Sequence, residues 1–183
     1  DNRLEVNLEK SDSGLLANAE AGDPESQYEL ALRYETGDRL PYSPESAFSW
    51  FLSAAKQGHI QSQEKVGLAY VKGFGVQSSP SKAIEWLTVA ADAGAANAQL
   101  MLSSLYMNGI GTRQDKEEAM RFLMLAAENE SPEAQAFLAK EYISGRSLKK
   151  DIETGSRWLL RSANNGFAKA QVFVGNGYYK GTY

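Results

Sequence analysis

The side chains that most often perform catalysis or hold metals are scarce in this sequence. His59 is the only histidine, and there is no cysteine among the 183 residues. Disulfides and cysteine nucleophiles are therefore excluded, and a zinc site is strongly disfavoured. A Ser-His-Asp triad would have to use His59, and no Gly-x-Ser-x-Gly elbow occurs in the chain. We predict no enzyme activity, no catalytic residue, no metal and no cofactor.

Two further patterns resemble chemical motifs but are better explained by structure. Gly73-Phe74-Gly75 follows a predicted helix, whereas the dinucleotide-binding fingerprint follows a strand and opens a helix with a third glycine. Asp115, Glu117 and Glu118 could supply a glycosidase-type acid pair. At the start of a helix, however, such residues are typical of capping and of a favourable interaction with the helix dipole.

Charge and hydropathy narrow the choice of partners. The net charge of −4 does not suggest nucleic acid. The charge is uneven, because residues 1–139 hold 11 Lys or Arg and 20 Asp or Glu, while residues 140–183 hold 8 and 3. The two parts would present opposite fields to a partner. The longest apolar runs fall far short of the roughly 18 residues that a membrane span needs.

The elements that must position any site repeat with a period of 36 residues. Three columns run through five copies: Gln27, Gln63, Gln99, Gln135 and Gln171; Tyr34, Tyr70, Tyr106, Tyr142 and Tyr178; Gly37, Gly73, Gly109, Gly145 and Gly181. Two more follow in each unit: Trp50, Trp86, Phe122 and Trp158, then Ala54-Ala55, Ala90-Ala91, Ala126-Ala127 and Ser162-Ala163. A fixed period of this length is typical of stacked-repeat folds.

Each unit has the pattern of two helices. In the first helix, Leu30, Ala31 and Tyr34 share one apolar face. In the second, Trp50 is followed one turn later by a small alanine that lets a neighbouring helix come close. Although the Trp and Tyr columns resemble a sugar-binding or base-stacking stripe, their strict recurrence on one face predicts core packing.

The same frame predicts the organisation of the chain. We expect about nine helices in one solenoid over residues 12–183, after an irregular leader at residues 1–11. The solenoid would comprise a half unit at 12–22, repeats at about 23–58, 59–94, 95–130 and 131–166, and a half unit at 167–183. Because the sequence starts at Asp1 instead of Met, we expect that residues were removed before it. We also expect further chain after Tyr183.

These residues carry a family resemblance. Residues 62–94, SQEKVGLAYVKGFGVQSSPSKAIEWLTVAADAG, resemble a Sel1-like repeat, and the likeness extends over about residues 12–183. Tetratricopeptide repeats are related, but their period is about 34 residues. Three positions depart from the pattern, because Arg39, Ser147 and Glu130 stand where turn glycines are expected. We expect those loops to deviate in shape.

The resemblance implies an all-α fold, a right-handed α-solenoid of antiparallel helix pairs with the first helices lining a concave face. It also implies a non-catalytic adaptor that binds a protein partner on that face. Many similar proteins are bacterial and exported or periplasmic, which we expect here, with the cytoplasm left open. An alternative is an immunity protein that neutralises a secreted toxic effector such as a phospholipase. Binding of a glycan or peptidoglycan is a further alternative.

Binding should use positions that the fold does not dictate. In the later first helices these positions become apolar, and exposed apolar patches usually mark partner sites. The candidate concave-face residues are Leu100, Met101, Met107, Phe137, Lys140, Ile143, Phe173, Tyr179 and Lys180. The alternative is that about half of the apolar side chains pack against the next first helix instead.

Overall fold

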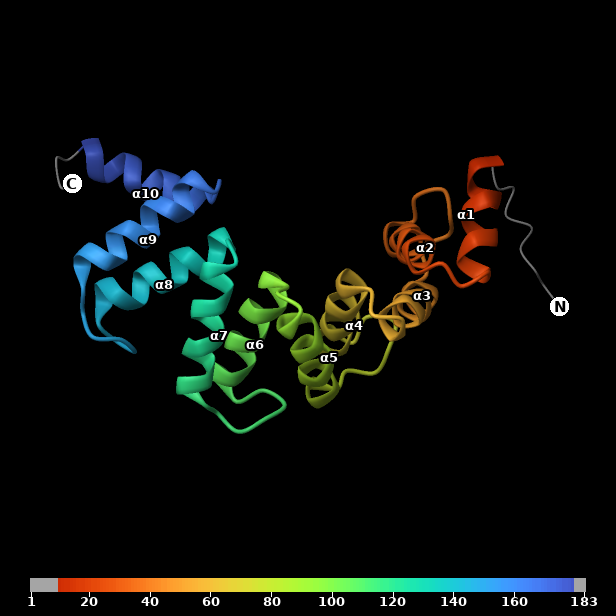
Figure 1. Cartoon of the computed structure of the whole chain (residues 1–183), viewed down its shortest axis with the longest axis horizontal. Coiled ribbons are helices and arrows are strands. Elements are labelled where there is room, and N and C mark those ends of the chain that lie inside the picture. Colours follow the sequence, from red (N-terminus) through yellow and green to blue (C-terminus); the bar gives the residue numbers. More distant parts are fainter. Residues whose placement is uncertain (1–9, 180–183) are drawn as a thin grey trace. The chain divides into compact units, whose positions relative to one another are not determined.

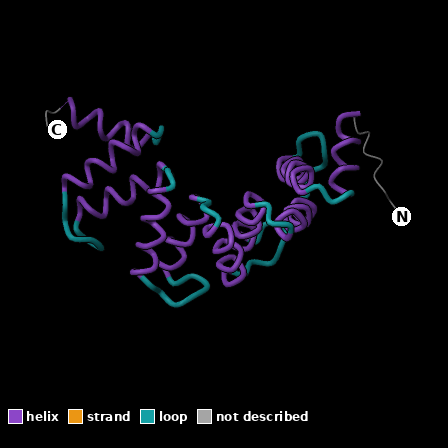
Figure 2. The backbone as a smooth tube through the Cα atoms, in the orientation of Figure 1, coloured by secondary structure: helices purple, strands orange, loops and turns teal. Residues whose placement is uncertain are grey.

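The computed structural model describes the backbone of residues 10–179 and the side chains of residues 14–175, and this part of the chain is entirely helical and turn (Figures 1 and 2). Its helices are α1 Lys10–Glu20, α2 Pro24–Thr36, α3 Pro44–Lys56, α4 Ile60–Lys72, α5 Pro80–Asp92, α6 Ala96–Asn108, α7 Lys116–Glu128, α8 Pro132–Ser144, α9 Ile152–Asn164 and α10 Ala168–Tyr179. The predicted all-α fold of helix pairs is confirmed. The described residues form ten helices, which is what the predicted half unit, four pairs and half unit add up to, so the expected number of about nine was one too low.

Short-range capping sets where the helices begin. Asp23 accepts a hydrogen bond from the Ser26 backbone N–H at 2.8 Å, directly before Pro24 at the first position of α2. Asp115 caps α7 in the same way through the N–H of Glu118 at 2.9 Å. Such bonds satisfy backbone donors that have no partner inside the helix. Side chains cap α2, α3, α4, α7, α8 and α9 in this way, whereas α5 and α6 have no side-chain cap.

The chain divides between Ala93 and Gly94 into two compact units. In the first unit, α1 to α5 pack each against the next helix in sequence, and α6 to α10 do the same in the second (Figure 1). The prediction of a single domain over residues 12–183 stays a prediction. The predicted leader, residues 1–11, lies outside the described residues except for its last two, which begin α1.

The core of each unit is built from the repeated apolar columns. In the first unit, Leu30 and Leu40 are buried, and Trp50 packs against them. In the second, Trp158 packs against buried Leu138 and Leu159. The aromatic columns thus belong to the core, as their recurrence predicted.

The glutamine column connects four first helices, α2, α4, α8 and α10, to the helix before each of them. The side-chain Nε2 donates to a carbonyl in the last turn of the preceding second helix, or of α1, in four places: Gln27 to Ala19 at 3.0 Å, Gln63 to Ala55 at 3.2 Å, Gln135 to Ala127 at 3.0 Å and Gln171 to Ala163 at 3.0 Å. Buried polar side chains are retained where they are hydrogen-bonded. Sequence spacing identified this column but not its role.

Two of the three departures from the turn pattern keep the expected backbone. Arg39 has φ 59°, against 65° at Gly75 in the same column, and Glu130 has φ 67°, against 89° at Gly94 in its own column. Both residues therefore adopt the left-handed conformation of the glycine they replace, and the expectation that these two loops deviate in shape was wrong at these positions. At Glu130 the turn is closed by two backbone hydrogen bonds, from the Glu130 N–H to the Ala127 carbonyl at 3.3 Å and from the Ser131 N–H to the Ala126 carbonyl at 3.0 Å. Ser147 does not have a positive φ, so the loop between α8 and α9 does differ.

Candidate partner-binding surface

Three of the predicted binding residues lie exposed on the second unit. Phe137 of α8 and Phe173 of α10 keep 46% and 58% of their surfaces in contact with solvent. Lys140, one turn after Phe137, is exposed as well. Tyr179 ends α10, but its side chain and all of Lys180 lie outside the described residues. A large exposed aromatic side chain is unusual on a surface that only solvent covers.

Other predicted residues pack inward. Leu100 and Met107 are half-buried and lie against the core cluster formed by α7 and α8. Ile143 lies against α9, since a Cβ added to Gly155 would come within 2.6 Å of its Cγ1. Met101 is half-buried. The structure therefore divides the apolar positions between internal packing and exposure, which the sequence had left as alternatives.

The same helix position is used differently in the first unit. Lys65 of α4 corresponds to Phe137 by the 36-residue period. Its Nζ lies 2.5 Å from Glu35 Oε2 of α2 and 5.4 Å from the centre of the Phe51 ring. The ion pair connects two successive first helices, α2 and α4, and the cation–π contact connects α4 to the second helix α3. The first unit thus fills this position with a paired charge, where the second exposes an aromatic ring.

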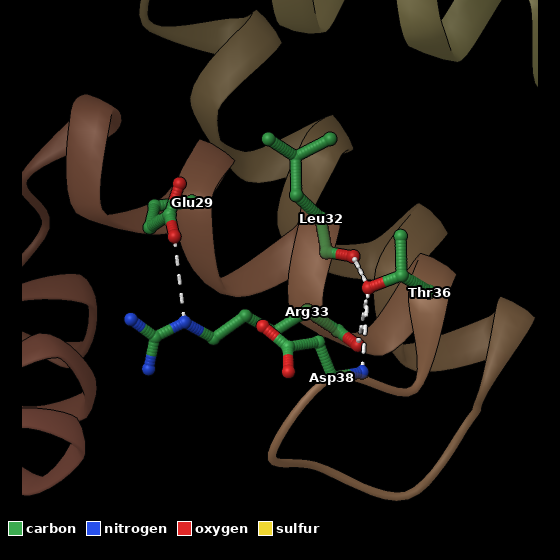
Figure 3. A network of polar contacts seen from close by, with 5 residues as sticks. All are labelled: Glu29, Leu32, Arg33, Thr36 and Asp38. Atoms are coloured by element: carbon green, nitrogen blue, oxygen red, sulfur yellow. Dashed lines mark hydrogen bonds and ion pairs between the residues drawn. The ribbon is translucent and has the colours of Figure 1, made fainter.

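In the first unit, several polar groups of α2 are hydrogen-bonded within the helix and the turn that follows it (Figure 3). Arg33 Nε donates to Glu29 Oε1 at 3.4 Å, one turn away. Thr36 Oγ1 donates to the Leu32 carbonyl at 2.9 Å and accepts from the Asp38 backbone N–H at 3.3 Å. Glu29 and Arg33 thus form an ion pair within α2. This face offers a partner few apolar contacts, so the second unit is the better candidate for binding.

Several positively charged side chains of α8 to α10 and of the loops between them take part in no ion pair among the described residues. Arg157 pairs with Glu153, and Arg161 pairs with Glu130 at 3.0 Å. The cations of α8 to α10 and their loops that take part in no ion pair within the described range are Lys140, Arg146, Lys149, Lys150 and Lys169. These ammonium and guanidinium groups are free to pair with an acidic partner.

Sequence reasoning missed a second feature of this unit. A hollow of about 610 Å³ lies where α8 ends and α9 begins, lined by Tyr142, Lys149, Lys150, Asp151 and Ile152. Ile152 keeps 58% of its surface exposed. The signal was present, because the first position of α9 holds a large apolar residue that no core column requires.

The lone histidine has a structural role. His59 caps α4, with Nδ1 accepting from the Ser62 backbone N–H at 3.3 Å. Its Nε2 lies 3.2 Å from Glu25 Oε2, and its ring lies 4.8 Å from the Tyr28 ring. Burial raises the pKa of Tyr28, and the nearby Lys65 ammonium opposes that rise. These contacts place His59 between two successive first helices, with both of its ring nitrogens engaged.

The described residues contain no group of three or more His, Cys, Asp or Glu side chains placed to hold a metal ion. None of the helices in that range combines the length and the apolar character that crossing a bilayer requires.

Comparison with known proteins agrees with the repeat frame. The family model described as Sel1 repeat matches residues 24–59, 60–94, 96–131 and 132–167. A search of curated proteins gave no match.

Three solved structures show the same fold. A Sel1 repeat protein from Oxalobacter formigenes is 28% identical with a TM-score of 0.81, over 88% of this chain and 66% of its own. A protective antigen of uropathogenic Escherichia coli is 30% identical with a TM-score of 0.83, over 92% of this chain and 36% of its own. An immunity protein from Pseudomonas aeruginosa is 23% identical with a TM-score of 0.62, over 85% of this chain and 58% of its own. This chain thus spans only part of the length of each of these proteins. The four matched repeats, which cover most of the chain, show that it belongs to the Sel1 repeat family.

Proposed function

We propose that this chain is a non-catalytic scaffold that binds a protein partner through the exposed face of α6, α8 and α10. Sel1 repeats generally mediate protein–protein interaction. The observation that carries the proposal is the pair of exposed rings, Phe137 and Phe173, on two first helices of one unit. Aromatic side chains are enriched among the residues that dominate interface energies. Leu100, Met101, Met107 and Ile143 are partly buried and remain proposed members of the surface, as do Tyr179 and Lys180.

The test compares two aspartate variants of matched chemistry. Phe137→Asp/Phe173→Asp should abolish binding of a protein captured from source-cell extract, while Tyr42→Asp in the first unit should not. Tyr42 is 63% exposed, so both variants change only surface aromatic residues. Circular dichroism should show unchanged helicity in each, because no core contact is removed. Loss of the fold in the double variant, or equal binding by all three proteins, would contradict the proposal.

A second candidate is an immunity protein acting on a secreted toxic enzyme. It is supported by the fold shared with a Pseudomonas aeruginosa immunity protein, a likeness that by itself concerns the fold alone. Inhibition by such a protein should be tight and should abolish the activity of the bound enzyme, whereas an assembly adaptor leaves its partner active. Measuring the activity of the captured partner with and without this chain distinguishes the two. An exported or periplasmic location is part of this proposal, and fractionation of the source cell tests it.

A further inference from the structure

We propose that the hollow between α8 and α9 is a second contact site, which binds an acidic, apolar-containing segment of a protein partner. The exposed rings of α8 and α10 are not among the residues that line it, and the inference rests on the proposed role of the chain as an interaction scaffold. We call it the loop site, formed by Tyr142, Lys149, Lys150, Asp151 and Ile152.

The backbone of the loop site is held in place. The Gly145 N–H donates to the Glu141 carbonyl at 2.9 Å, and the Asp151 N–H donates to the Tyr142 carbonyl at 2.9 Å, so both ends of the loop are fixed to α8. Between them, Leu148 packs against the core of the second unit. A partner that binds this loop would not have to order it first, which favours affinity.

The charge of the loop site favours an anionic occupant. Lys149 and Lys150 are exposed and take part in no ion pair within the described residues. Asp151 is already committed, because its carboxylate accepts from the backbone N–H of Thr154 at 3.0 Å and from its hydroxyl at 2.7 Å. These bonds hold the pKa of Asp151 below its usual value, and the carboxylate stays at the start of α9. The two ammonium groups are therefore available to carboxylates from outside.

The apolar part of the loop site favours a peptide over a simple anion. Ile152 is 58% exposed at the first position of α9, and the Tyr142 side chain lines the same hollow. The equivalent position in α7 is Lys116, so the helix itself does not require an apolar residue there. The chain is also acidic over residues 1–139, which disfavours long polyanions such as nucleic acid and anionic membranes. A short segment with Asp or Glu beside Leu, Ile or Phe fits both the charge and the apolar lining.

The experiment selects short random peptides displayed on phage against the full chain, and then measures the affinity of the enriched peptides as synthetic probes. Lys149→Glu/Lys150→Glu should weaken binding of acidic probes by about tenfold or more. The matched control is Arg113→Glu/Lys116→Glu, an equal charge change in the α6–α7 loop and at the first residue of α7, which should leave affinity unchanged. Probes in which lysine replaces the acidic residues should regain affinity for the Lys149→Glu/Lys150→Glu variant. Ile152→Ser should weaken the original probes without changing the dependence of their affinity on salt.

Four results would overturn the inference. Enriched peptides without acidic residues would remove its basis, as would equal losses in the loop variant and the matched control. Anionic phospholipid vesicles that bind the chain as well as the probes do, and lose binding in the same loop variant, would replace the protein segment with a lipid surface. Acidic probes that lose affinity only in Phe137→Asp/Phe173→Asp would leave the proposed function standing and refute the loop site alone.

Discussion

Replacing Gln135 by methionine tests whether the glutamine column stabilises the stacking of helix pairs. Gln135 is fully buried in α8. Its Nε2 donates to the Ala127 carbonyl at the end of α7 at 3.0 Å, and its Oε1 accepts from Asn165 Nδ2, just after α9, at 3.2 Å. One side chain thus joins three consecutive helices. Methionine keeps nearly the same volume and removes both hydrogen bonds.

The expected loss follows from the groups left behind. Each hydrogen bond contributes about 0.5–1.5 kcal/mol net. The Ala127 carbonyl keeps a second donor, the Asn129 N–H, and Asn165 is exposed, so neither partner is left buried without a hydrogen bond. We therefore expect Gln135→Met to lower the free energy of unfolding by about 1–2 kcal/mol, or roughly 2–8 °C in Tm for a chain of this size. Gln135→Ala should cost about 2–4 kcal/mol, because it also leaves a cavity.

The assay is urea denaturation followed by circular dichroism at 222 nm, a wavelength that reports helix content. Gln171→Met is the control, since Gln171 is exposed and has a single such bond, to the Ala163 carbonyl, so its loss should stay below about 1 kcal/mol. A double-mutant cycle with Asn165→Ala isolates the Gln135–Asn165 bond. The reasoning is refuted if the free energy of unfolding of Gln135→Met lies within about 0.5 kcal/mol of the wild-type value, or if the cycle shows no coupling between Gln135 and Asn165.

Three further predictions follow from the same structure. Ala93→Asn should stabilise the chain by about 0.5–1 kcal/mol, because an asparagine there could donate a hydrogen bond to the Gln63 side chain. Asn129 and Asn165 make this bond to Gln99 and Gln135 at the equivalent positions, and Ala93, with φ −81° and ψ 4°, has a backbone that suits it. An unchanged denaturation midpoint would contradict this. Glu130→Gly should be about 1 kcal/mol more stable than Glu130→Ala, because both remove the carboxylate while only glycine tolerates φ 67° without strain; equal stability of the two variants in urea would show that the turn is not strained. Asp151→Asn should reduce the loss of stability in acid. The pKa of Asp151 is lowered from 3.8, first by the hydrogen bond from the Thr154 backbone N–H and second by the one from the Thr154 hydroxyl. The ionised cap therefore contributes stability that is present above the ordinary pKa of aspartate and is lost as the pH falls through the lowered pKa. Asparagine also caps but does not titrate, so urea titrations between about pH 5 and pH 2 should show a smaller decline than the wild type; the same decline would contradict the assignment.

The sequence alone determined the period, the helix pairs and the family. These properties are local. A capping residue such as Asp23 accepts a hydrogen bond from the backbone N–H three residues later, and an aromatic residue recurs at the position of Trp50 in each second helix. In a stacked-repeat fold each unit contacts mainly its neighbours. A pattern within one period therefore predicts most of the packing.

Tertiary structure decided how positions on the same helix face are used. Met107 and Phe137 both occupy apolar positions between the core columns, yet Met107 packs inward and Phe137 is 46% exposed. Burial of such a residue depends on side chains from other helices, which its own period does not specify. The same reason applies to the hollow beside Ile152, because its lining residues come from the end of α8, the loop and the start of α9, which the fold of the loop back onto α8 brings together.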